Sequence, residues 1–160
     1  MVNKLITDLL ESAENKLFFA EKELSRPFED SVTFAVCHWS NHAIREYLIS
    51  VIVYNYSLEY PQDEEIRNII KKIEIQNIEF LIKHASRLDQ RFSDLEISHV
   101  ACSGLDKNFQ SDMYCLEVAS VNKCADTAKE LANLVNEYIF NTQNHKDNHD
   151  LKMVLDVYHN

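Results

Sequence analysis

Glycine and proline are almost absent from this chain of 160 residues, which has one glycine, Gly104, and two prolines, Pro27 and Pro61. An average chain of this length would hold roughly ten glycines, because glycine makes up about 7% of protein residues. β-Sandwiches, barrels and doubly wound folds place glycine in their many turns. The scarcity therefore predicts an all-α fold with few connections. It also excludes a glycine-rich phosphate loop, because Gly104 stands alone.

Paired cysteine motifs and long apolar runs of membrane length are missing as well. The four cysteines form no CxxC pair; they are Cys37, Cys102, Cys115 and Cys124. Buried thiols without a disulfide are the expected state, and a disulfide or zinc ligation are the alternatives. The N-terminus leads directly into an amphipathic pattern, which is typical of neither a signal peptide nor a membrane span. We therefore expect a cytoplasmic protein without membrane contact.

The charge balance is strongly acidic, with a formal net charge of −10 at pH 7 and a pI near 5.1. A field of this sign repels phosphate backbones, so nucleic-acid binding is disfavoured unless a local basic stripe overrides it. Hydrophobic residues make up 46% of the chain and charged residues 26%. These proportions are typical of one globular domain rather than of a disordered segment.

Hydrophobic periodicity predicts a single-domain, up-and-down bundle of four to five helices within residues 1–141. The first helix spans residues 3–24, the second runs from Asp30 or Ser31 to about residue 56, and the third begins at Asp63 and ends near residue 86. A shorter helix or irregular stretch follows as far as Gly104, and the last long helix covers about residues 111–140. Residues 142–160 are expected to form a polar tail, to which residues 151–158 could add a short helix. The inner face of the third helix is predicted to comprise Ile66, Ile69, Ile70, Ile73, Asn77, Phe80, Leu81 and His84.

The second predicted helix is apolar on nearly every side over residues 47–54. A helix of this kind must be covered on every side. It lies at the centre of the bundle, or a second chain covers it. We expect a homodimer that buries part of this surface.

The same helix carries a polar cluster that we take as a candidate binding surface: His38, Asn41, His42, Arg45 and Glu46. His38 and His42 are one turn apart, and Glu46 continues their row. Two imidazoles and a carboxylate could ligate zinc or iron. However, the pattern lacks the glutamate that follows the first histidine in metalloproteases. Polar residues lining a groove or interface are the favoured interpretation, and we expect no tightly bound metal.

Two weaker patterns lie further along the chain. Lys83, Arg87 and Arg91 are spaced by four residues and would form a basic stripe if one helix held all three. Such a stripe could bind a phosphate or an acidic partner. The alternative is that the three side chains lie on an ordinary solvated face. Glu96 and His99 match one ExxH step of the di-iron bundles. Those sites need a second ExxH copy and two further glutamates, which are not found.

Two stretches resemble helices of the HEPN superfamily. The run DSVTFAVCHWSNHAIREYL, from Asp30 to Leu48, resembles the second HEPN helix, in which apolar residues precede a polar pair, small residues and a charged residue. The closing run is similar to the last long helix of the family and passes through Cys115, Ala119, Cys124, Ala125, Ala128, Ala132, Val135 and Ile139. With the order of the helices, the likeness covers about residues 1–140.

The resemblance implies a small helical bundle, often a homodimer, in a family associated with RNA cleavage, nucleotide binding, toxin–antitoxin pairs and nucleotidyltransferase partners. HEPN nucleases carry an arginine, a polar residue and a histidine shortly after it. Here Arg91 and His99 are separated by seven residues and Phe92 follows the arginine, so no catalytic residue is assigned.

The expected function is therefore a non-catalytic HEPN-like binding module without a cofactor. It would dimerise and act through a protein or nucleotide partner, such as a nucleotidyltransferase or a toxin–antitoxin mate. The alternatives are a divergent RNA-cleaving enzyme that uses Arg91 and His99, and a metal-dependent enzyme that uses His38 and His42.

Overall fold

A computed structural model describes residues 2–27, 33–95, 97 and 118–141 of the chain. These residues form helices and no strand, so the all-α fold class is confirmed for the described part of the protein. The helices are α1 (Lys4–Leu24), α2 (Thr33–Glu59), α3 (Asp63–Glu74), α4 (Ile78–Leu88), α5 (Arg91–Asp94) and α7 (Val118–Asn141). The described ranges thus hold six helices, where the sequence predicted four to five.

The additional helices arise because the predicted third helix is broken in its middle. α3 ends at Glu74, and Asn77 begins α4 as its N-cap, accepting a hydrogen bond on its side-chain oxygen from the backbone N–H of Phe80 at 2.8 Å. An asparagine in this role competes with helix continuation. The placement of Asn77 on an inner helix face was therefore wrong, and Phe80 is 42% exposed rather than buried.

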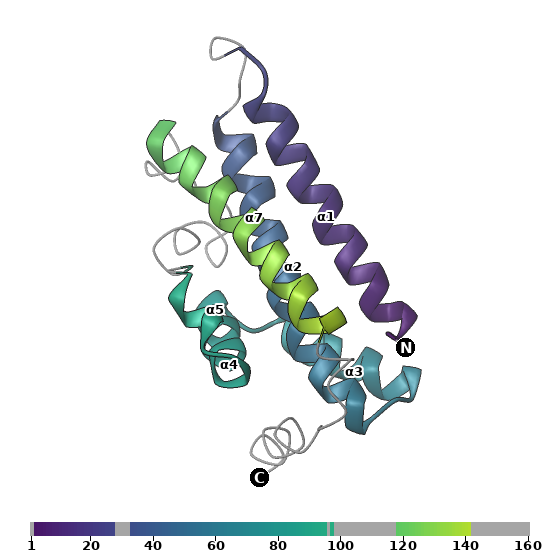
Figure 1. The fold of residues 1–160 in the computed structure, drawn as a ribbon. Helices are drawn as coiled ribbons and strands as arrows, with labels where there is room; N and C mark the ends of the chain where they lie inside the picture. Colours follow the sequence, from purple (N-terminus) through teal and green to yellow (C-terminus); the bar gives the residue numbers. More distant parts are fainter. Residues whose placement is uncertain (1, 28–32, 96, 98–117, 142–160) are drawn as a thin grey trace.

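α2 occupies the centre of the described fold. α1 and α7 run alongside it, and α3 and α4 also contact it (Figure 1). Every residue of the apolar stretch 47–54 is at most 4% exposed within the single chain. The chain therefore covers this stretch itself, and no partner is needed to bury it.

Small side chains and one buried polar contact fix the packing of the three long helices. Ala13 on α1, Ala43 on α2 and Ala128 on α7 are fully buried, which lets the helix axes approach closely. Between α2 and α7, the hydroxyl of Tyr138 donates to Oδ1 of Asn55 at 2.9 Å, and both side chains are buried. The hydrogen bond joins these two helices within a largely apolar core.

The ends of the long helices lie only partly within the described residues. Asn3 caps α1, with its side chain accepting from the N–H of Leu5 at 2.7 Å, as the predicted start at residue 3 requires. The predicted N-cap of the second helix, residues 98–117 and the tail from residue 142 lie outside the described residues. Within the described part, no helix has the length and apolar character needed to cross a membrane.

Candidate functional site: a polar and aromatic face on α1 and α2

A row of polar side chains on α2 meets one lysine of α1. The rings of His38 and His42 lie with their centroids 4.6 Å apart, edge to face. One turn further on, Oε1 of Glu46 accepts a hydrogen bond from Nζ of Lys16. The other carboxylate oxygen of Glu46 is buried and has no hydrogen-bond partner among the described residues. The structure therefore places His38 against His42 and pairs Glu46 with Lys16, a residue that was not part of the predicted cluster.

The local electrostatics keep both imidazoles neutral at pH 7. Burial, followed by the neighbouring His38, Lys16 and Arg45, lowers the pKa of His42 to about 4. Burial, followed by the charge of Lys16, also lowers the pKa of His38. Neutral imidazoles can accept a hydrogen bond. The adjacent ammonium of Lys16 opposes the approach of a cation to this cluster.

Arg45 has a structural role at the junction between α3 and α4. Its guanidinium donates to the backbone carbonyl of Glu74, the last residue of α3, and to that of Gln76 at 2.5 Å. Basic side chains commonly satisfy the last carbonyls of a helix in this way. The guanidinium of Arg45 thus ties α2 to the α3–α4 turn.

Asn41 faces the protein interior and not the surface. It is 3% exposed, and the preceding Ser40 is fully buried. Oδ1 of Asn41 and Oγ of Ser40 have no hydrogen-bond partner among the described residues. Of the five residues of the predicted binding surface, the structure leaves His38, His42, Arg45 and Glu46 partly exposed and buries Asn41.

Aromatic side chains of α1 extend the two histidines into a continuous row across both helices. The centroid distance is 5.1 Å from His38 to Trp39 and 5.4 Å from Trp39 to Phe19, and Phe18 lies 6.1 Å from Phe19. Phe18 is 59% exposed and Phe19 is 46% exposed. We call these five residues the aromatic row: Phe18, Phe19, Trp39, His38 and His42.

The two phenylalanines of this row were not among the residues predicted to form a site. Leu17 and Ala20 carry the buried stripe of α1, so adjacent apolar residues at positions 18 and 19 must point away from it. The presence of two large apolar residues outside the buried stripe could therefore have been recognised from the sequence. The contact of Phe19 with Trp39 could not, because it depends on how α1 and α2 pack.

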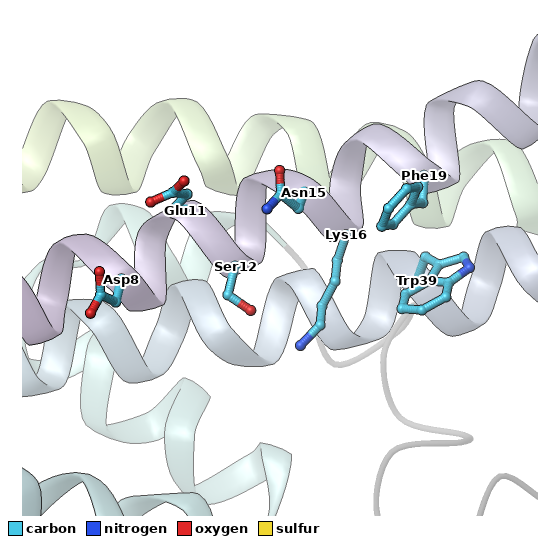
Figure 2. A pocket seen from close by; sticks show the side chains of 7 residues that line it. All are labelled: Asp8, Glu11, Ser12, Asn15, Lys16, Phe19 and Trp39. Carbon is cyan, nitrogen blue, oxygen red and sulfur yellow. The ribbon is translucent and has the colours of Figure 1, made fainter.

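Two hollows flank the aromatic row, and both are lined by Phe19 and Trp39. One, of about 370 Å³, runs along the middle of α1, and the side chains of Lys16, Phe19 and Trp39 lie close together at one end of it (Figure 2). Its other lining residues are Asp8, Glu11, Ser12 and Asn15. The second hollow, of about 380 Å³, lies towards the end of α1 and is lined also by Lys22, Glu23 and Arg26. The first hollow thus carries two carboxylates and one ammonium, and the second carries two cationic side chains and one carboxylate.

The predicted basic stripe does not share one helix. Lys83 and Arg87 are exposed on α4, which ends at Leu88, and Arg91 begins the separate helix α5. The guanidinium of Arg91 contacts Asp89 at 2.8 Å and Glu137 of α7 at 2.9 Å. Hydrogen bonds to these carboxylates raise the pKa of Arg91. Arg91 thus links α5 to α7, and only Lys83 and Arg87 remain as a pair on one surface.

Buried on α4, His84 occupies the inner position that the sequence predicted. It is 6% exposed, and its ring lies 5.6 Å from that of Phe80 and 6.1 Å from that of Tyr56. Burial, and then the charge of Arg87, lowers its pKa to about 4. His84 is therefore a neutral core residue at pH 7.

Among the residues that the structure describes, no three or more His, Cys, Asp or Glu side chains lie together in a way that could hold a metal ion. Glu96 and His99 of the ExxH step lie outside these residues. No protein-family model, no curated protein and no solved structure matches this chain. The likeness to HEPN domains therefore stays a prediction from the sequence.

Proposed function

We propose that this chain is a non-catalytic, HEPN-like helical binding module that forms a homodimer through the aromatic row and acts through a protein partner. The observation that carries the proposal is the exposure of Phe18 and Phe19 beside Trp39. Large aromatic side chains are enriched at the centres of protein interfaces, because they bury much apolar area at little cost in conformational entropy. Contiguous exposed aromatic surface of this kind is the usual mark of a contact site.

The charges around the row favour a second copy of this chain as its occupant. The hollow on one side of Phe19 has two carboxylates and one ammonium in its lining, and the hollow on the other side has two cationic side chains and one carboxylate. A twofold axis that passes through the row at right angles to α1 would place two α1 helices antiparallel. The hollow with net negative charge on each copy then faces the hollow with net positive charge on the other, so the surface is complementary to itself, as a twofold dimer requires.

Sedimentation equilibrium tests this dimer. Phe19→Ala should weaken self-association by about 30-fold or more, because each dimer loses two central aromatic anchors. Phe80→Ala is the matched control, since Phe80 has a similar exposure, 42% against 46%, but lies on α4. Wild-type protein that sediments as a monomer at tens of micromolar would refute the dimer.

A charge exchange tests the antiparallel arrangement separately. Glu11 and Lys22 are both exposed on α1. Glu11→Lys and Lys22→Glu should each weaken the homodimer by about tenfold, because like charges then face each other at both symmetric contacts. A mixture of the two variants restores both contacts and should form a heterodimer of wild-type strength. A mixture as weak as the single variants would contradict the arrangement.

The two catalytic alternatives make separate predictions. In the RNA-cleaving alternative Arg91 acts with His99, but its guanidinium already contacts Asp89 and Glu137. RNA cleavage by purified protein that is lost in both Arg91→Ala and His99→Ala would establish that alternative. In the metal alternative His38 and His42 bind a cation beside the ammonium of Lys16, and stoichiometric metal in untagged protein would establish it. Identification of the protein that co-purifies with the wild-type chain, and not with Phe19→Ala, would test the partner.

A further inference from the structure

Two cysteines that are distant in the sequence meet between α2 and α7. Cys37 lies near the start of α2 and Cys124 in the first half of α7, 87 residues later. Their Sγ atoms are 3.4 Å apart, and the side chains are 1% and 0% exposed. The spacing of the cysteines along the chain did not predict this contact.

The surroundings of the pair are small and apolar. The sulfur atoms lie in a buried cluster that is separate from the main core and consists of Ala20, Val36, Cys37, Val121, Cys124 and Ala125. Trp39 and Leu24 pack against this cluster. The two cysteine side chains thus form part of the contact between α2 and α7.

We propose that Cys37 and Cys124 are a redox pair that forms a reversible intrachain disulfide when the protein is oxidised by a peroxide. A disulfide bond needs the sulfur atoms at about 2.05 Å. The observed separation of 3.4 Å therefore has to shorten by a little over 1 Å, which rotation about the two Cα–Cβ bonds and a small shift of the helices can supply. The inference is independent of the dimer proposed above.

The chemistry balances with hydrogen peroxide as the oxidant. One thiolate attacks a peroxide oxygen; the S–O bond forms, the O–O bond breaks, and the departing hydroxide takes a proton to become water. The second thiolate then attacks the sulfenic sulfur, so that the S–S bond forms and the S–O bond breaks, and the second hydroxide leaves as water. Two thiols are oxidised by two electrons, and one peroxide is reduced to two waters.

Burial of the two thiols makes their oxidation slow and restricts it to small oxidants. Buried thiols react slowly, because the reagent must enter during a transient opening of the packing. Hydrogen peroxide is small enough to use such openings. Once the first sulfur is oxidised, the second lies in contact with it, so the disulfide forms before a further peroxide molecule arrives.

The disulfide should stabilise the fold and change the emission of the only tryptophan. It closes a loop across 87 residues, and chain-entropy arguments give a rise in Tm on the order of 10 °C for a loop of this length in a protein of this size. Trp39 is the single tryptophan and packs against the cysteine cluster. Its fluorescence should therefore be quenched on oxidation and recover on reduction.

The experiment uses the full chain with Cys102→Ser and Cys115→Ser, which leaves only the proposed pair. After prolonged exposure to hydrogen peroxide, neither of the two remaining cysteines should react with an alkylating reagent under denaturing conditions. The intact mass should fall by two hydrogen atoms, and dithiothreitol should reverse both changes. Adding Cys124→Ala to this background is the control; it should give no disulfide within the chain and no increase in Tm.

Three results would overturn the proposal: both thiols still reactive after the exposure, sulfinic acid in place of the disulfide, or disulfides between chains only. If the double serine variant does not fold, wild-type protein is oxidised, alkylated and digested instead. A peptide pair joining Cys37 to Cys124 is then the expected product. A joined pair that includes Cys102 or Cys115 in its place would equally overturn the proposal.

Discussion

The buried hydrogen bond between Tyr138 and Asn55 gives the sharpest test of how α2 and α7 are held together. The tyrosine hydroxyl donates to Oδ1 of Asn55 at 2.9 Å, while the amide of Asn55 donates to the carbonyl of Val51 at 2.9 Å. Asn55 is 1% exposed and Tyr138 is 3% exposed. Tyr138→Phe keeps the ring and removes only the hydroxyl, so Oδ1 of Asn55 stays buried without its donor.

The loss of stability expected for Tyr138→Phe follows from the missing hydrogen-bond donor. Leaving a buried polar atom unsatisfied costs about 1–3 kcal/mol, and we expect about 2 kcal/mol for Tyr138→Phe. For a chain of this length that corresponds to a fall in Tm of roughly 4–8 °C. Urea unfolding followed by circular dichroism measures the loss, and an unchanged m-value would show that the unfolding transition is otherwise the same.

A double-mutant cycle identifies the hydrogen bond as the cause. Asn55→Leu removes the acceptor, so adding Tyr138→Phe to it should cost much less than in the wild type. Tyr54→Phe is the control, because Tyr54 is also a buried tyrosine and the described residues provide no hydrogen bond for its hydroxyl. Equal losses for Tyr138→Phe and Tyr54→Phe, or no coupling in the cycle, would refute the reasoning.

Three further predictions concern charged and titratable groups. The folded-state pKa of His84, about 4, lies below its ordinary value of 6.5, so its contribution to stability is complete above pH 6.5 and is lost as the pH falls towards 4. The free energy of unfolding should drop by at most about 3 kcal/mol over this window, and acid titrations of urea unfolding should show a shallower drop for His84→Gln. Arg45→Ala should cost about 1–2 kcal/mol and accelerate hydrogen exchange at the α3–α4 junction, whereas unchanged exchange there would contradict the capping role. Arg91→Ala should cost less than about 1 kcal/mol, because the side chain is 47% exposed, and chemical denaturation that shows a larger loss would mean that its link to α7 is more than a surface ion pair.

The sequence alone determined the helical class of the described residues and several of their helix boundaries. One glycine in 160 residues leaves few positions for the turns of a sheet protein, and local signals such as Asn3 mark where a helix begins. Burial of His84 also followed from the helical period. These features depend on residues within a few helical turns of one another, so they can be predicted from the local sequence pattern.

The middle of the chain shows where local signals conflict. The helical period predicted one helix from Asp63 to about residue 86, but the chain turns between Glu74 and Ile78, which leaves Ile75 81% exposed. The capping bond of Asn77 and the contact of Arg45 with the turn stabilise the break. The guanidinium comes from a different helix, so its contribution could not be predicted from the turn itself.

Only the tertiary structure decided which residues form the candidate sites. Phe19 meets Trp39, Lys16 meets Glu46, and Cys37 meets Cys124. Periodicity places each residue on a face of its own helix, but it does not specify which neighbouring helix covers that face or at what level. Those relations depend on how the small buried residues of α1, α2 and α7 interlock. For the same reason the apolar stretch of α2, which suggested a dimer in the sequence, is covered by the other helices of its own chain.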